Sequence, residues 1–225
     1  MQPNQLPSQY LVVEGLEGAG KSHAVAVLAE YLESQGIPYH IVREPGGTKV
    51  AEEIRGILKH TEEQLTPYTE LLLFVAARAQ VYALEVAPRL AEGTWVISDR
   101  SALTTHAYQM YGRQLANEFP FPVFSEMHCR AVGRRYDHVF LLDIDPILGL
   151  QRAQNRGALD RIEQSGAEFF QRARQGYHHA MTYSGAVRGG SIIDASAPLD
   201  QVRRELLTSV EKFVCQLCSR VSSQP

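Results

Sequence analysis

The segment formed by residues 15–22 constrains this chain more than any other. It reads GLEGAGKS, a complete G-x-x-x-x-G-K-[ST] phosphate-binding loop, and the apolar residues 10–13 come directly before it. In such a loop the backbone N–H groups face inward, the lysine reaches the β- and γ-phosphates, and the hydroxyl binds Mg²⁺. The sequence therefore predicts a nucleoside triphosphate site that consists of Gly15, Leu16, Glu17, Gly18, Ala19, Gly20, Lys21 and Ser22.

One residue of this loop does not suit bound phosphates. Glu17 places a carboxylate inside the loop, where its negative charge would repel the phosphate oxygens. We therefore expect Glu17 either to point away from the phosphates or to bind a second ligand.

Bulk properties set the frame for the rest of the chain. It has 225 residues and no Pro/Gly/Ser-rich linker or internal repeat, which predicts one domain over residues 1–225. The net charge of −3 argues against a broad nucleic-acid or membrane surface. The start is polar rather than a signal sequence and no apolar run reaches about 18 residues, so we expect a soluble, cytoplasmic protein.

The cysteines are odd in number: Cys129, Cys215 and Cys218. The Cys215-x-x-Cys218 pair has no partner pair with which to hold zinc. We expect reduced thiols of an intracellular protein, with a redox or metal role for the pair as the alternative.

Short β-type runs alternate with helical segments along the chain. The runs are residues 10–13, 39–42, 94–98, 138–142 and 191–193. This alternation predicts an α/β fold with a five-stranded parallel sheet flanked by helices. Ligands of such sheets bind beyond the carboxyl ends of the strands, so candidate site residues are expected in segments 14–22, 43–48, 99–108 and 143–145.

Helix boundaries are also readable from the sequence. The first helix is expected from Lys21 to residue 35, before Gly36. Thr66 is a candidate N-cap, and Pro67 suits the first position of a long, largely core-facing helix. Asp145 and the proline after it repeat the pattern and predict a helix over residues 147–156.

Asp99 and Arg100 follow the third β-type run. Asp99 near Ser22 would hold Mg²⁺ through water, and Arg100 would neutralise transferring phosphoryl oxygens; a surface ion pair is the alternative. Motor and transporter ATPases usually place Glu after this aspartate to activate water, and no guanine-recognition motif occurs in the chain. The pattern therefore favours a small kinase that uses ATP and Mg²⁺ over a hydrolase or a GTPase.

Three further groups of residues each allow two interpretations, one as part of a binding site and one as ordinary structure. Arg43 follows the second β-type run. It would either bind the phosphate of an acceptor or be a strand-end arginine without a functional role. Phe74 and Arg78 share a helix face as i and i+4, which suits a nucleobase site or a core phenylalanine beside an ion pair. The arginines of segment 151–164 would act as a mobile lid over the triphosphate or form a solvated helix face; they are Arg152, Arg156 and Arg161.

Taken together and in order, residues 14–22, 43–48, 74–78, 99–100 and 159–163 resemble thymidylate kinases of the bacterial type, over about residues 10–213. The resemblance implies a P-loop kinase fold and transfer of the ATP γ-phosphoryl group to dTMP, which gives dTDP. It also implies Mg²⁺ and a homodimer. Another nucleotide or deoxynucleoside kinase, and a catalytically silent ATP-binding regulator of the same fold, are the rival interpretations.

The resemblance also assigns roles to residues. It implies that Glu17 faces the 3′-hydroxyl of the acceptor, that Phe74 stacks on thymine, that Arg78 binds the base edge, that Thr105 lies beside the base, that Tyr108 crowds the sugar 2′ position, and that Arg43 and Arg100 hold the monophosphate. Some relatives carry a catalytic arginine in the phosphate loop and others in the lid. Because this loop has Gly18 and Ala19 there, the lid at about 151–164 must supply it, with Arg156 first and Arg152 second.

Overall fold

The computed structural model describes residues 6–119, 121–133, 136–182 and 187–222 of the chain, around a five-stranded parallel sheet. The strands are β1 (Tyr10–Gly15), β2 (Tyr39–Arg43), β3 (Trp95–Asp99), β4 (His138–Asp143) and β5 (Gly190–Asp194). Their order in the sheet is β2-β3-β1-β4-β5, which puts β1 in the centre. Each predicted β-type run forms a strand, and the predicted fold class is confirmed.

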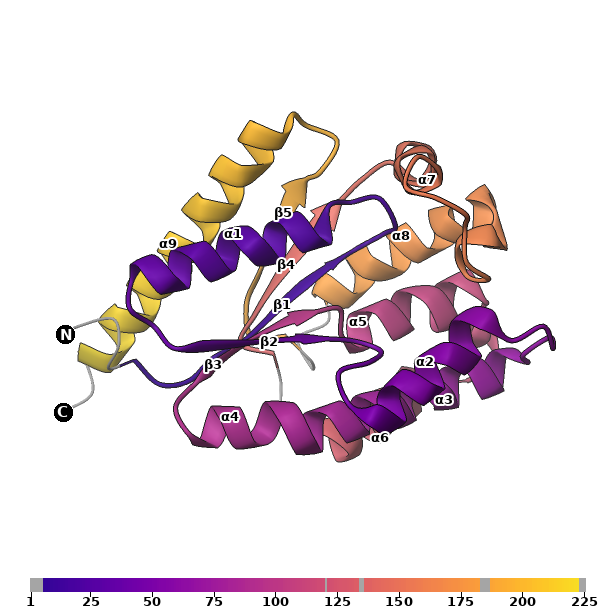
Figure 1. Ribbon diagram of the computed structural model, residues 1–225, viewed down its shortest axis with the longest axis horizontal. Coiled ribbons are helices and arrows are strands. Elements are labelled where there is room, and N and C mark those ends of the chain that lie inside the picture. Colours follow the sequence, from indigo (N-terminus) through magenta and orange to yellow (C-terminus); the bar gives the residue numbers. More distant parts are fainter. Residues whose placement is uncertain (1–5, 120, 134–135, 183–186, 223–225) are drawn as a thin grey trace.

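Helices cover both faces of this sheet. The α-helices are α1 (Lys21–Ser34), α2 (Lys49–His60), α3 (Pro67–Val81), α4 (Ala87–Ala91), α5 (Ala102–Thr105), α6 (Phe121–Val132), α7 (Pro146–Gln154), α8 (Ala167–Thr182) and α9 (Leu199–Ser222). There are also π-helical segments, η2 (Tyr82–Val86) and η3 (His106–Gly112), and 3₁₀ turns, η4 (Leu115–Asn117) and η5 (Glu163–Ser165). Helices α1 and α9 lie on one face, and α3 to α6 and α8 lie on the other (Figure 1).

Local hydrogen bonds explain where the predicted helices begin. The Thr66 hydroxyl accepts a hydrogen bond from the backbone N–H of Thr69, and Pro67 occupies the first turn of α3. The Asp145 carboxylate caps α7 in the same way, with Oδ1 2.9 Å from the N–H of Ile147. An N-cap acceptor satisfies N–H groups that have no partner within the helix, which fixes the start of each helix.

The continuous helix over Pro67–Ala91 is long and apolar enough, by length and composition, to cross a membrane. The core helix of a soluble protein can have the same character. Two of its four charged residues, Glu70 and Arg78, are only 1% and 3% exposed and are paired with other parts of the chain. Helix α3 also packs against α2 and α6, so part of its surface is buried within the protein.

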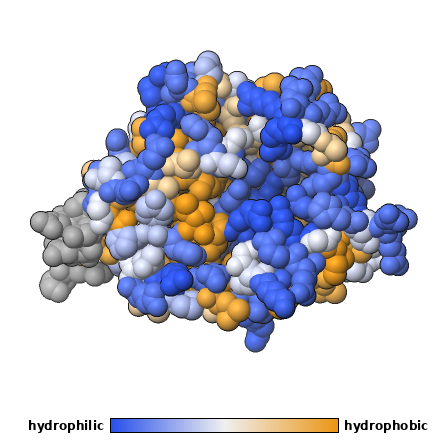
Figure 2. Space-filling view, viewed as in Figure 1, coloured by the Kyte–Doolittle hydropathy of each residue, from blue (hydrophilic) through white to orange (hydrophobic). Residues whose placement is uncertain are grey.

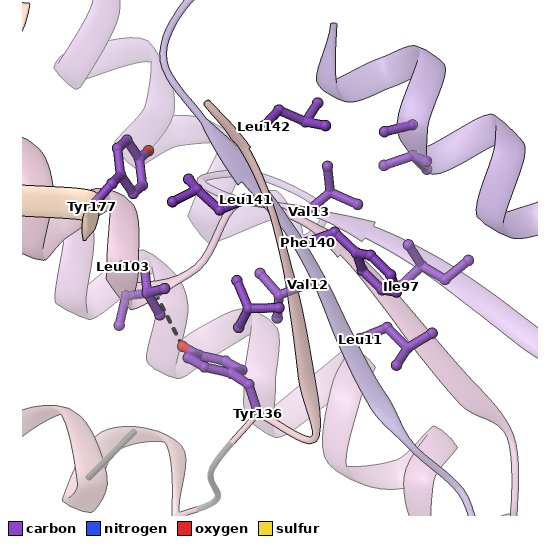
Figure 3. Close-up of a cluster of buried hydrophobic side chains, with 14 of the residues drawn as sticks. Leu11, Val12, Val13, Ile97, Leu103, Tyr136, Phe140, Leu141, Leu142 and Tyr177 are labelled. Carbon is purple, nitrogen blue, oxygen red and sulfur yellow. Dashed lines mark hydrogen bonds between the residues drawn. The ribbon is translucent and has the colours of Figure 1, made fainter. Parts of the chain in front are cut away.

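The core forms on both faces of the central strands, because successive strand residues point to opposite sides. Figure 3 shows Leu11, Val13, Phe140 and Leu142 on the side of the sheet that faces α1, and Val12 and Leu141 on the other side with Tyr136 and Tyr177. All of these side chains are at most 1% exposed. Burial of one such aliphatic side chain stabilises a fold by about 1.5–3 kcal/mol, so the strand ends that carry the polar residues rest on a firmly packed sheet.

Candidate active site

A cavity of about 470 Å³ opens at the carboxyl edge of the sheet. Its walls come from the phosphate loop, the ends of β2 and β3, helices α2 and α3, and the segment after α7. Figure 2 shows the surface hollowed in this region, with hydrophilic residues gathered there; in Figure 1 the same region lies between α7 and α2. The cavity therefore lies where sheets of this class bind their ligands.

The phosphate loop has backbone geometry that only glycine suits at two positions. Gly15 has φ 145° and Gly18 has φ 73°. A Cβ at Gly15 would lie 2.5 Å from the carbonyl oxygen of Leu142, and one at Gly18 would lie 2.1 Å from that of Gly149. The loop is thus tightly packed against β4 and α7. Inside it, the Lys21 ammonium donates hydrogen bonds to the carbonyl of Gly15 at 3.1 Å and to that of Leu16 at 2.8 Å.

Glu17 is held by positive charge within the cavity. Its carboxylate forms an ion pair with Arg100, lies 4.0 Å from the Lys21 ammonium, and accepts a hydrogen bond from the Tyr108 hydroxyl at 3.5 Å. Burial alone would raise the pKa of Glu17, but Arg100 and Lys21 lower it to about 2. Burial also lowers the pKa of Lys21 to about 8; Arg100 acts in the same direction and Glu17 opposes it. Because Arg100 and Lys21 offset its charge, the Glu17 carboxylate repels bound phosphates less than an isolated carboxylate would.

Arg100 adopts a strained backbone conformation at the end of β3. Its φ is 78°, a left-handed value that costs a residue other than glycine roughly 1–3 kcal/mol. The Ser98 hydroxyl donates to the Arg100 carbonyl at 2.7 Å and so supports this turn. The guanidinium donates to Thr104 Oγ1 at 3.2 Å and lies 5.5 Å from the centre of the Tyr108 ring. Such strain persists where the surrounding structure fixes it, and it is common at functional sites.

Phe74 and Arg78 follow one another along α3 at the far end of the cavity. Phe74 is 4% exposed and lines the cavity, so it is both a core residue and a wall of the site. Arg78 lies behind that wall. Its Nε donates to Glu44 Oε2 at 2.6 Å, and its Nη2 donates to the Ser101 carbonyl and to Thr105 Oγ1, each at 2.9 Å. Its Nη1 has no hydrogen-bond partner within the part of the chain that the structure describes.

Two buried glutamates, neither of them among the site residues predicted from the sequence, support the site. Glu14 accepts hydrogen bonds from Ser101 Oγ at 2.7 Å and from Thr104 Oγ1 at 2.6 Å, which fixes the segment after Arg100. Glu44 pairs with Arg78, and burial raises the pKa of its carboxyl although Arg78 opposes this. The sequence does contain a signal for both roles: each glutamate stands at the end of an apolar strand that leads to the site, where a charged residue is unusual unless it serves the site.

Arg43 lines the same cavity from the end of β2. Its side chain is 50% exposed, and Nη2 donates to Glu52 Oε1 at 2.8 Å. The same carboxylate oxygen accepts a hydrogen bond from the N–H of Gly47 at 2.9 Å. Glu52 thus holds both Arg43 and the glycine turn after β2 at the cavity.

The residues predicted for a metal fit a site that a nucleotide would complete. Asp99 Oδ1 is buried and has no hydrogen-bond partner among the described residues, and both Asp99 and Ser22 line the cavity. Within the same described ranges, no group of three or more His, Cys, Asp or Glu side chains could hold a metal by itself. One carboxylate and one hydroxyl suit Mg²⁺, which usually keeps several waters and takes its other ligands from substrate phosphates.

The lid arginines take three different positions. Arg156 lines the cavity, is 63% exposed, and has Nη2 3.5 Å from Glu163 Oε1. Arg152 instead donates from Nη1 to the carbonyl of Ala195 at 2.8 Å, next to the end of β5. Arg161 donates from Nε to the carbonyl of Leu58 at 2.8 Å. The structure therefore brings one of the two candidate catalytic lid arginines to the cavity.

The cysteines are all free thiols. Cys129 and Cys215 are exposed, and Cys218 is partly buried. None of the three lines the cavity described above.

Comparisons with known proteins extend the likeness well beyond the phosphate loop. A sequence model of the thymidylate kinase family matches residues 13–206. The thymidylate kinase of Shewanella loihica is 44% identical over 213 residues, which cover 92% of this chain and 97% of the relative. That of Shewanella amazonensis is 44% identical over 209 residues (90% and 96%), and that of Idiomarina loihiensis is 38% identical over 211 residues (93% and 100%).

Proposed function

The chain belongs to the thymidylate kinase family, and from this premise we propose how its residues transfer the γ-phosphoryl group of ATP to dTMP. An oxygen of the dTMP phosphate attacks the γ-phosphorus, the bond from that phosphorus to the β,γ-bridging oxygen breaks, and ADP and dTDP result. The acceptor oxygen is already anionic, so no general base is needed. The observation that supports this most strongly is that one cavity joins the phosphate loop, which includes Glu17, to Arg100 and Phe74.

We place ATP in the loop formed by residues 15–22. Lys21 reaches the β- and γ-phosphates, and the backbone N–H groups of the loop bind their oxygens. Ser22 and Asp99 would hold Mg²⁺, which would offset the negative charge that develops on the phosphate oxygens. The buried Asp99 Oδ1, which has no hydrogen-bond partner among the described residues, supports this placement.

We place dTMP on the opposite side of the cavity. Glu17 accepts a hydrogen bond from the 3′-hydroxyl, Arg43 and Arg100 bind the monophosphate, and Tyr108 lies against C2′ and excludes ribose. The ion pair between Glu17 and Arg100 supports a shared sugar-phosphate site, because it holds both groups in one wall of the cavity.

The base lies in the cavity against Phe74, with Arg78 at its edge. Phe74 stacks on thymine, and such stacking contributes about 1–3 kcal/mol per base. Arg78 Nη1 supplies the donor for the base edge, because its other nitrogens are engaged by Glu44, Ser101 and Thr105. Thr105 thus acts beside the base mainly by orienting Arg78.

Arg156 is the lid arginine that meets the transferring phosphoryl group. Its side chain is exposed and borders the cavity, whereas Arg152 is engaged at the carbonyl of Ala195. A guanidinium that approaches the γ-phosphate on lid closure would stabilise the transition state and help to exclude water.

We further propose that the chain acts as one domain, with a lid at about 151–164, in a cytoplasmic homodimer. Large apolar side chains are exposed on the helical face that carries α3, η2 and α6, and a second copy would cover them: Leu72 is 57% exposed, Leu84 56% and Val123 49%. Analytical ultracentrifugation of the wild-type chain and of Leu84→Asp tests the dimer. A monomeric wild-type chain would contradict it.

A coupled assay with ATP and dTMP tests the activity. We expect dTDP formation, weaker use of dUMP, and little use of CMP or thymidine. Lys21→Ala serves as the active-site control, because loss of its charge should lower kcat about 10²-fold or more. Preference for CMP or thymidine would indicate another nucleotide or nucleoside kinase. ATP binding without turnover would indicate a silent regulator.

A further inference from the structure

Glu70 occupies a position that the proposed mechanism does not use. It lies in the first turn of α3 and is 1% exposed. Its Oε1 accepts hydrogen bonds from Gln109 Nε2 at 2.8 Å and from Arg113 Nε at 3.1 Å. Its Oε2 accepts from Arg113 Nη2 at 3.3 Å and forms a second ion pair with Arg161. One buried carboxylate therefore faces two guanidinium groups and an amide.

These partners come from separate parts of the active site. Gln109 stands next to Tyr108 in η3, and Arg113 follows the end of that segment. Glu70 itself is one helical turn from Phe74 on α3, which gives the two side chains the same helix face. Arg161 belongs to the lid. The Glu70 carboxylate is thus a direct link between the lid and both sides of the proposed acceptor pocket.

The lid is fastened next to Arg161 by two further contacts on α2. Arg161 Nε donates to the carbonyl of Leu58 at 2.8 Å, and the Lys59 ammonium lies 2.7 Å from Asp160 Oδ2. At the other end of the lid, Arg152 is bound to the carbonyl of Ala195. Arg156 lies between these two anchored ends and is 63% exposed. The lid is therefore held at both ends, and its candidate catalytic arginine lies between them, exposed and paired with Glu163 of the same segment.

We propose that Glu70 is a positioning residue for phosphoryl transfer: through Arg161 it anchors the acceptor side of the lid and so keeps Arg156 over the cavity. This inference rests on the proposed function. Through Arg113 and Gln109 the same carboxylate contacts the segment that carries Tyr108, so a bound acceptor strengthens the anchor. The state of the carboxyl agrees with this role. Burial would raise the pKa of Glu70, but Arg113, Gln109 and Arg161 together lower it, so the anchor is charged at neutral pH.

Enzyme kinetics distinguish the contact of Glu70 with Arg161 in the lid from its contacts with Gln109 and Arg113. Arg161→Ala and Glu70→Gln should each lower kcat about tenfold, with KM for ATP changed less than threefold because the phosphate loop is intact. The loss of kcat in the double variant should be smaller than the product of the two single losses, since both single variants remove the pair between Glu70 and Arg161. Arg161→Lys keeps the charge and should recover part of kcat. Arg113→Ala should instead mainly raise KM for dTMP.

A matched control uses an exposed glutamate that also pairs with an arginine. Glu30 lies 2.9 Å from Arg203 on the surface of α1, and Glu30→Gln should leave kcat and KM unchanged. Wild-type kcat in Arg161→Ala, or additive losses in the double variant, would overturn the proposal. If Glu70→Gln does not fold, as a melting curve would reveal, Arg161→Ala and Arg161→Lys carry the test, because the Arg161 side chain is partly exposed.

Limited trypsin digestion gives a readout that does not depend on catalysis. Cleavage after Arg161 requires its side chain to leave Glu70, so Glu70→Gln should be cut there at least several-fold faster than the wild-type chain, and dTMP should slow the cut only in the wild type. Equal cleavage rates in the two proteins would contradict the anchor. If the wild-type chain did not phosphorylate dTMP, the proposed function would fail, while the digestion would still report on the anchor.

Discussion

Arg100 and Glu17 form an ion pair that joins the end of β3 to the phosphate loop. The pair brings an acidic residue into a site for anionic substrates, and it does so at a point that borders both proposed nucleotide sites. Because Arg100 and Lys21 hold the pKa of Glu17 at about 2, the carboxylate remains an acceptor for a hydroxyl group throughout the neutral range. The arrangement explains how a P-loop can carry a glutamate without rejecting ATP.

The first prediction concerns Glu17. We expect Glu17→Ala to weaken dTMP binding much more than ATP binding, because loss of a hydrogen bond to a charged group costs about 1.5–3 kcal/mol. Isothermal titration with each nucleotide measures both effects. Ala19→Ser, at a loop position that the Glu17 carboxylate does not contact in the structure, controls for general disturbance of the loop. A loss confined to ATP would show that Glu17 serves only the triphosphate.

The second prediction follows from Lys21. Burial holds its pKa at about 8 in the free protein, so the ammonium loses its proton as the pH rises through 8. The value of kcat/KM for ATP should therefore fall above pH 8, by up to tenfold per pH unit. At saturating ATP, kcat should fall less, because bound phosphates favour the charged lysine. A flat kcat/KM for ATP between pH 7 and 9.5 would contradict this.

Local patterns were sufficient to predict the sheet and the helix starts at Thr66 and Asp145, because each depends on neighbouring residues. The support of the site was not predictable in this way. Glu70 reads as an ordinary first-turn glutamate, yet its partner Arg161 is 91 residues away. The polar segment 151–164 gives Arg152 and Arg156 the same local surroundings in the sequence. The structure distinguishes them, because Arg152 donates a hydrogen bond to the carbonyl of Ala195, which is distant in the sequence.

The third prediction tests that distinction. Arg156→Ala should lower kcat about 10²-fold or more with little change in KM for dTMP, since a guanidinium that acts on the transferring phosphoryl group is effective mainly in the transition state. Arg152→Ala should affect kcat much less, because its side chain binds the Ala195 carbonyl away from the cavity. Steady-state kinetics of the two variants decide between them, and the reverse order of effects would exchange their roles.

The fourth prediction concerns the choice of base. Arg78 Nη1 can only donate, so it suits a base with a carbonyl at position 4, such as thymine or uracil, and not cytosine with its amino group. We expect kcat/KM for dCMP to be at least about 10²-fold below that for dTMP, and Arg78→Ala to reduce this ratio by lowering the value for dTMP. Melting curves are needed alongside, because Arg78 is buried against Glu44. An unchanged ratio in Arg78→Ala would place base recognition elsewhere.

The fifth prediction concerns stability in mild acid. Burial, with a smaller effect of Arg78, lowers the pKa of His128 to about 3, and burial lowers that of His138 to about 4. An unfolded chain protonates its histidines near pH 6.5. Between pH 6.5 and about 4 the unfolded chain therefore binds protons that the folded protein does not, and the free energy of unfolding falls as the pH falls. The slope is at most about 1.4 kcal/mol per pH unit for each histidine.

Urea unfolding at pH 7, 6 and 5 measures this slope. His128→Gln should unfold with a smaller pH dependence than the wild-type chain, whatever its absolute stability, because one of the buried imidazoles that resists protonation is gone. The Tyr136 hydroxyl lies 3.2 Å from His128 Nε2, and glutamine can still reach it with a polar group. His60→Gln, at an exposed position, is the matched control and should keep the wild-type slope. Equal free energies of unfolding at pH 7 and pH 5 in the wild-type chain would show that its buried histidines do take up protons in the folded state.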